Sequence, residues 1–73
     1  MFKQGDIVYI IENNRKVEQV KILQHAYGLY TVQLIKRGGT FRVKEHRLFS
    51  SEQEAELELA KIKLKRDYGE LLR

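Results

Sequence analysis

Lysine and arginine are the residue types whose placement in this chain points to chemistry. Residues 1–49 hold nine Lys and Arg residues and four Asp and Glu residues. Residues 50–73 hold five Lys and Arg residues and six Asp and Glu residues. Cations fixed on one surface neutralise phosphates and release their counterions, so the basic first segment favours a polyanionic partner, DNA or RNA. The alternative is that the charge serves solubility alone. The predicted nucleic-acid contacts are Lys21, Lys36, Arg37, Arg42 and Lys44.

Residue types that carry catalysis or bind metals are sparse. The chain has no Cys, so it has neither a disulfide nor a thiolate ligand. His25 and His46 lie far apart in the sequence, whereas a zinc ion takes three or four convergent protein ligands. Ser50 and Ser51 precede a helical pattern and are interpreted as helix caps. We therefore expect no enzymatic activity, metal, cofactor or small-molecule substrate.

Composition and hydropathy bound the class of protein. A chain of 73 residues with 42% hydrophobic content predicts one folded domain. The apolar run at 7–11 is bounded by Asp6 and Glu12. It is far shorter than the ~20 residues of a membrane span and has no export-signal pattern. We expect a cytoplasmic protein without a membrane contact.

The elements that must position the cations are short strands. Strand-length apolar runs separated by turn residues are typical of a small all-β unit. Asn13-Asn14 and Gly38-Gly39 mark two of the turns, because Asn and Gly tolerate left-handed backbone. The predicted strands are 7–12, 17–24, 29–35 and 40–44, with a short fifth at 48–49. The predicted β unit spans 1–49, and a helix at 50–73 packs on it.

Pairing of the third and fourth strands can be predicted from the residue types. When paired residue numbers sum to 75, Leu34 faces Phe41 and Val32 faces Val43, while polar residues meet on the other face. A half-buried sheet requires this separation of apolar and polar pairs.

Pairing of the second and third strands follows the same rule. When the numbers sum to 54, Ile22 faces Val32, and a three-residue loop at 26–28 ends in Gly28, where left-handed backbone is needed. Both pairings together predict one exposed row across three strands, made of Lys21, Gln33 and Arg42.

Residues 50–73 carry a helical pattern with two apolar stripes. Ser51 and Glu54 form a predicted capping box. The short stripe, Ala55, Leu59 and Ile62, is assigned to the sheet. The longer stripe would be exposed as a contact site for a second copy of the chain or another protein. Its members are Leu57, Ala60, Leu64, Tyr68 and Leu71. The alternative is a helix that lies in a groove and buries both stripes at its N-terminal end.

Several short motifs together suggest a family. They are Gly5-Asp6-x-Val8, Leu29-Tyr30-Thr31-Val32, Gly38-Gly39 and Arg42-Val43-x-Glu45-x-Arg47-Leu48-Phe49, which runs into Ser50-Ser51-Glu52. This pattern resembles small SH3-like barrel proteins, of the Tudor or KOW kind, found in Gram-positive bacteria and their prophages. The resemblance implies a five-stranded SH3-like β-barrel with a C-terminal α-helix and a tendency to bind nucleic acid or proteins.

Two functions remain open from these observations. The first is weak, non-specific nucleic-acid binding by a small accessory protein that uses a basic sheet face. The second is a protein-interaction module, which forms a homodimer or docks on a partner through its C-terminal helix.

Overall fold

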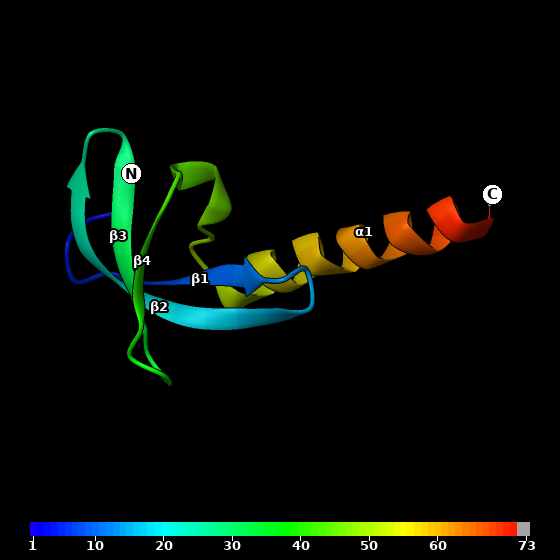
Figure 1. The fold of residues 1–73 in the computed structure, drawn as a ribbon, viewed down its shortest axis with the longest axis horizontal. Helices are drawn as coiled ribbons and strands as arrows, with labels where there is room; N and C mark the ends of the chain where they lie inside the picture. The colour runs from blue at the N-terminus through cyan, green and yellow to red at the C-terminus, as the bar shows by residue number, and fades with distance from the viewer. Residues whose placement is uncertain (72–73) are drawn as a thin grey trace.

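The chain folds into an antiparallel sheet followed by one long helix (Figure 1). The computed structural model describes the backbone of residues 1–71 and the side chains of residues 1–66. The elements are β1 (Ile7–Glu12), β2 (Lys16–Ala26), β3 (Leu29–Leu34), β4 (Thr40–Val43), the short 3-10 helix η1 (Glu45–Arg47) and α1 (Glu52–Leu71). The sheet has the order β1-β2-β3-β4. The prediction of a mainly-β fold with a C-terminal helix is confirmed.

The sheet is open, and the predicted closed barrel with five strands is not shown. In place of a fifth strand, Phe49 makes a single bridge to Tyr9. The Tyr9 N–H donates to the Phe49 carbonyl and the Phe49 N–H to the Tyr9 carbonyl, both at 2.9 Å. Because η1 takes up residues 45–47 and α1 begins at Glu52, too little extended chain remains between them for a ladder.

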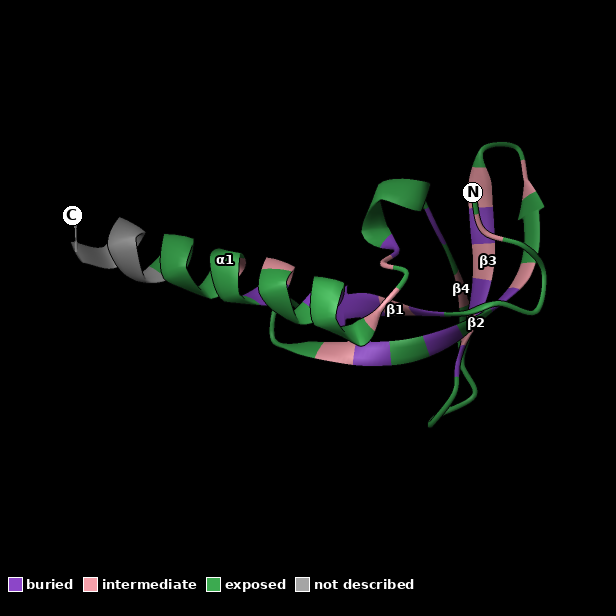
Figure 2. Cartoon of the chain, turned by 180° about the vertical axis from the view of Figure 1, so that it is seen from behind, coloured by how far each residue is buried: buried purple, intermediate pink, exposed green. Residues whose placement is uncertain are grey.

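One face of the sheet carries the main hydrophobic core. Its buried members are Val8, Ile10, Val20, Ile22, Tyr30, Val32, Leu34, Val43 and Leu48. Phe2 and Phe41 are partly buried against them. Leu48 follows η1, and alternate residues of the four strands supply the rest of this set, as the two-residue period of a strand requires. Figure 2 shows the buried positions as purple bands on the strands.

The pairing of β2 with β3 matches the prediction only as far as Ile22, which lies opposite Val32. A bulge at Leu23 then shifts the register by one residue, so Gln24 lies opposite Thr31. A bulge inserts one unpaired residue and bends the strand. The bulge therefore places a polar side chain, not a leucine, beside Thr31.

The same bulge changes the turn between β2 and β3. Ala26 lies opposite Leu29, so the loop has two residues instead of the three predicted. Tyr27 and Gly28 both have left-handed backbone, with φ of 55° and 76°. Two such residues make the turn whose twist suits a two-residue hairpin. His25 now lies opposite Tyr30, and the two rings stack at 4.0 Å between centroids.

The predicted pairing of β3 with β4 is wrong by two residues. Val32 lies opposite Phe41, not Val43, and Thr31 lies opposite Arg42. A slip of two residues keeps every side chain on its face, so Val32, Leu34 and Val43 stay buried and Phe41 stays partly buried.

Turn geometry gives a physical reason for that slip. The Gly38 N–H donates to the Leu34 carbonyl and the Leu34 N–H to the Gly39 carbonyl, both at 2.8 Å. Gly38 has a φ of 77°. The predicted register would have required a two-residue turn with Arg37 also left-handed, which is unfavourable for a residue with a long side chain.

Helix α1 packs on the other face of the sheet, over β1 and β2. Ala55 and Leu59 are buried and Ile62 is half-buried, and Ile11 of β1 is buried on the side opposite the main core. The prediction that the short stripe faces the sheet is therefore confirmed.

The longer stripe of α1 is exposed where it is described. Leu57 and Leu64 keep 59% and 56% of their surface exposed, and Ala60 is exposed too. The alternative in which both stripes are buried is therefore excluded for these residues. The side chains of Tyr68 and Leu71 lie outside the described residues. Figure 1 shows the second half of the helix running past the sheet.

The start of α1 is set by a serine cap. The Ser51 Oγ accepts the Glu54 N–H at 3.1 Å, and the Ser50 Oγ donates to the Glu54 carboxylate at 3.0 Å. Ser51 thus acts as the predicted N-cap, which satisfies one of the free N–H groups of the first turn. Glu52 and Glu54 in that turn suit the positive end of the helix dipole.

Replacing Val32 by alanine tests the core. Val32 is fully buried and central in the sheet, so Val32→Ala should lower the free energy of unfolding by about 1–3 kcal/mol through reduced burial and a new cavity. Urea unfolding followed by circular dichroism measures the change. Ile35→Ala is the control, because Ile35 is 45% exposed and should cost much less. Equal losses of stability at both positions would contradict the assigned core.

Candidate nucleic-acid interface

The structure spreads the predicted cations over several places. Lys21 is exposed on β2, on the face away from the main core, where it pairs with Ile7 and Gln33. The exposed row predicted across three strands does not form, because Thr40 and not Arg42 lies opposite Gln33. Lys36 is exposed in the turn between β3 and β4.

Arg37 is held by acidic residues of the β1–β2 hairpin. Its Nη2 is hydrogen-bonded to the Glu12 carboxylate and lies 3.8 Å from Glu18 Oε1. Lys16 Nζ lies 3.1 Å from the same Glu18 oxygen. The charge of Arg37 is therefore compensated within the chain, and the four side chains tie the β3–β4 turn to the β1–β2 hairpin.

This ion network shifts two pKa values. The hydrogen bond from Lys16 lowers the pKa of the Glu18 carboxyl, and the charges of Lys16, Arg37 and Lys36 lower it further, against the opposite effect of burial. The hydrogen bond to Glu12 raises the pKa of Arg37 above its already high usual value. Both shifts favour the charged forms.

A second group of basic residues has no such compensation. Arg42, Lys44, His46 and Arg47, named here the basic edge, surround a concavity of about 350 Å³ between β4 and η1. Leu29 and Val43 complete its lining. The ion pairs found among the described residues involve none of these four side chains. The basic edge therefore presents three cations and a histidine to solvent.

A larger concavity of about 700 Å³ adjoins the basic edge and shares Arg42 with it. Its other lining residues are Gln24, Ala26, Tyr27, Thr31, Thr40 and Phe41. Among these described residues there is no carboxylate, so a polyanion meets no fixed negative charge in either concavity. Amides and hydroxyls supply neutral hydrogen-bonding groups beside Arg42.

Tyr27 lies at the tip of the β2–β3 turn, and both its exposure and its backbone conformation are unusual for a tyrosine. Its side chain is fully exposed, although large aromatic side chains are usually partly buried. Its backbone has a φ of 55°, a region that a bulky residue adopts only at some cost. An aromatic ring held in solvent by an unfavourable backbone is a feature found at binding sites.

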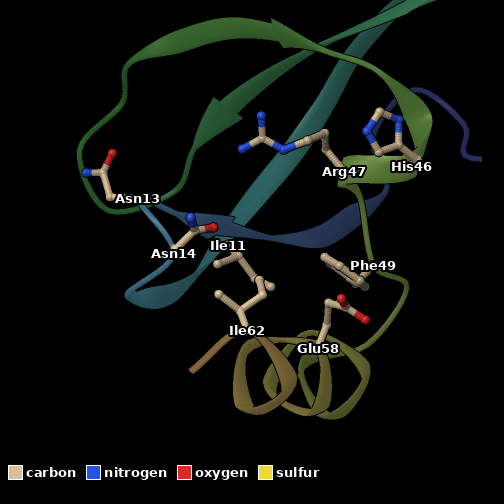
Figure 3. Close-up of a pocket in the computed structure, with 8 residues that line it drawn as sticks. All are labelled: Ile11, Asn13, Asn14, His46, Arg47, Phe49, Glu58 and Ile62. Carbon is tan, nitrogen blue, oxygen red and sulfur yellow. The ribbon is translucent and has the colours of Figure 1, made fainter. Parts of the chain in front are cut away.

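Figure 3 shows a third concavity, of about 450 Å³, between η1, α1 and the β1–β2 turn. Ile11, Phe49 and Ile62 form its apolar part, and Arg47 extends over it (Figure 3). The Glu58 carboxylate also lines it. Because this carboxylate would repel phosphates, the third concavity does not extend the basic edge as a polyanion site.

Two residues of the basic edge, His46 and Arg47, were missing from the sequence prediction. The spacing Arg42-x-Lys44-x-His46-Arg47 is a local signal that could have indicated a basic cluster. This spacing alone does not predict the cluster, because alternate residues share one face only while the chain stays extended. The chain turns into η1 after Lys44, and that turn brings all four side chains to one concavity.

Among the described residues, no three His, Asp or Glu side chains lie close enough together to hold a metal ion. Helix α1, as far as it is described, is too polar to cross a membrane.

No protein-family model and no curated protein sequence matches this chain. The resemblance to SH3-like barrel proteins therefore stays a prediction.

The lowered pKa of Glu18 predicts acid sensitivity. An unfolded chain binds a proton near the ordinary pKa of 4.5, whereas the folded chain binds it only at lower pH. The stability contributed by Glu18 is therefore present above pH 4.5 and disappears as the pH falls through the folded pKa. Glu18→Gln should be less stable than the wild type at pH 7, and the two proteins should converge at low pH.

Urea unfolding between pH 7 and pH 3 measures this convergence. Glu45→Gln serves as the control, since Glu45 is exposed on η1 and outside the ion network. A stability difference between Glu18→Gln and the wild type that does not change with pH would contradict the role of Glu18.

Proposed function

We propose that this protein binds single-stranded nucleic acid weakly and without base specificity. The observation that supports this most is the placing of uncompensated cations beside a fully exposed aromatic ring. Arg42 lines both the basic edge and the concavity that holds Tyr27.

The basic edge and the Tyr27 ring would contact different parts of a nucleotide. Arg42, Lys44 and Arg47 would neutralise successive phosphates and release counterions, which gives affinity that depends steeply on salt. Tyr27 would stack on a base, and stacking accepts every base because each has a flat π-face. Neither contact reads base edges, so the binding carries little sequence information. A dissociation constant of about 10⁻⁴–10⁻⁶ M at physiological salt is expected for such a surface.

A single strand fits the site better than a duplex. Stacking needs an unpaired base that can reach a protruding ring, and Tyr27 protrudes at a hairpin tip. Readers of the major groove commonly insert an α-helix. The first turns of α1 carry four carboxylates, which would repel the phosphates of a duplex. They belong to Glu52, Glu54, Glu56 and Glu58.

Reversing two charges of the basic edge tests the proposal. Arg42→Glu with Lys44→Glu should abolish binding to a labelled single-stranded oligonucleotide, measured by fluorescence anisotropy at low salt. Replacing each residue by alanine should instead make the slope of log K against log salt shallower by about 0.7 for each phosphate that the variant no longer neutralises.

A matched control separates local contacts from net charge. Lys3→Glu with Arg15→Glu changes the net charge equally, at exposed positions outside both the basic edge and α1. It should weaken binding only slightly. The proposal is wrong if wild-type protein at about 1 mM leaves the anisotropy unchanged, or if both double variants weaken binding equally.

Tyr27→Asn should separate stability from binding. Asparagine adopts left-handed backbone more readily than tyrosine, so the variant should be more stable by about 0.5–1 kcal/mol. It should also bind single-stranded DNA several-fold more weakly because the stacking ring is gone. Tyr27→Phe, which keeps the ring, should bind like the wild type. A Tyr27→Asn variant with undiminished affinity would exclude the stacking role.

We also propose that the open sheet is a variant of the SH3-like barrel, in line with the sequence resemblance. Two observations support this. The Tyr9–Phe49 bridge joins the first strand to the segment after β4, where a fifth strand would pair. The ion pairs of Arg37 with Glu12 and Glu18 draw the β3–β4 turn toward the first hairpin.

A second candidate function, protein interaction through α1, is favoured by a separate observation. Leu57 and Leu64 are exposed on the side of the helix away from the sheet. Exposed leucines in line on one helix face are typical of a contact surface.

A further inference from the structure

We propose that α1 pairs with α1 of a second copy of this chain in an antiparallel arrangement, with Leu57 of one copy against Leu64 of the other. This deepens the protein-interaction candidate and is independent of nucleic-acid binding.

The apolar part of the proposed interface is a narrow stripe. At 100° per residue, Leu57, Ala60 and Leu64 fall within an arc of about 60°. The residues packed on the sheet, Ala55 and Leu59, fall on nearly the opposite side of the helix. A second helix can therefore lie along the stripe without displacing any contact within the chain.

The spacing of the stripe suits two helices related by a twofold axis. Leu57 and Leu64 are two turns apart, about 10 Å along the helix. An axis near Ala60 would bring each leucine beside the other leucine of the second copy. The small side chain of Ala60 at the axis lets the two backbones approach to the ~8 Å of close helix pairs.

Charge complementarity selects a second copy as the occupant and the antiparallel direction. In an antiparallel pair, the same flank of each helix meets itself in reverse order. On one flank, Glu56 would meet Lys63 of the second copy. On the other flank, Glu54 would meet Lys65 of the second copy. All four side chains are exposed, and the twofold axis makes each of these pairs twice.

The parallel arrangement lacks this complementarity. It would place the acidic first half of one helix beside the acidic first half of the other, and the basic halves likewise, and like charges repel. In the antiparallel pair, Lys61 of both copies lies near the axis. Its long aliphatic stem lets each ammonium group reach solvent.

The size of the interface predicts a weak dimer. Two helices in contact over about three turns bury much less than the ~1,200 Å² of a stable interface. A contact of this size belongs to the weak, transient class, and we expect a dissociation constant between the micromolar and millimolar ends of the affinity scale, on the order of 10⁻⁵–10⁻⁴ M. Such a dimer would place two copies of the basic edge in one particle, so a longer strand could engage both.

Sedimentation equilibrium of the whole chain at about 10 µM to 1 mM, without nucleic acid, tests the proposal across the range of the expected dissociation constant. The wild type should show a monomer–dimer equilibrium, and Leu64→Lys should remain monomeric with an unchanged circular dichroism spectrum. A wild type that is monomeric at the highest of these concentrations overturns the proposal.

Charge variants test the direction of pairing. Glu56→Lys and Lys63→Glu each place like charges on the meeting flanks, so each alone should weaken the dimer about threefold to tenfold. An equimolar mixture of the two variants restores both pairs and should dimerise as strongly as the wild type. Glu45→Lys, an exposed reversal on η1, should have no effect. A mixture no tighter than its separate components would overturn the antiparallel arrangement.

Discussion

Burial of β1 on both of its faces is the constraint on which the rest of this structure depends. Val8 and Ile10 point into the main core, and Ile11 points to α1. A domain of this size buries only about 60% of the surface of its unfolded chain, so one strand shared by two apolar layers increases burial without more residues. The shared strand also fixes where α1 begins, because Phe49 bridges Tyr9 two residues before the Ser51 cap.

The fold pairs some of the charged side chains with one another and leaves other cations outside these ion pairs. Arg37 in the β3–β4 turn pairs with Glu12 and Glu18 of the β1–β2 hairpin, and Lys16 pairs with Glu18 as well. These two cations and two carboxylates neutralise one another. Among the described residues, Arg42, Lys44 and Arg47 take part in none of the ion pairs. The basic edge thus gathers three of these cations beside the exposed ring of Tyr27, and a cluster of cations attracts a polyanion.

Helix α1 is longer than the layer it covers. Its first turns bury Ala55 and Leu59 against β1 and β2, whereas Leu57 and Leu64 on the opposite side remain in water. Exposure of such leucines is unfavourable by the hydrophobic effect, and the order of acids before bases along the helix lets a reversed copy cover them. The proposed surface for nucleic acid and the proposed surface for self-association lie on different elements, so one can be altered without the other.

Local patterns in the sequence determined the four strands of the sheet, the Ser51 cap, the packed stripe of α1 and most of the core residues, because each depends on a short period that the residue types display. They also predicted a fifth strand at 48–49, where the structure has only the Phe49 bridge. They could not determine the pairing of β3 with β4, since a slip of two residues preserves both faces and leaves the hydrophobic pattern unchanged. The Leu23 bulge and the left-handed Tyr27 depend on fitting one turn to two strands. The partners of Arg37 lie 19 and 25 residues away in the chain, and the basic edge forms only where η1 turns back beside β4. Tertiary structure alone decided these features, because they arise from contacts between segments whose separate patterns carry no information about one another.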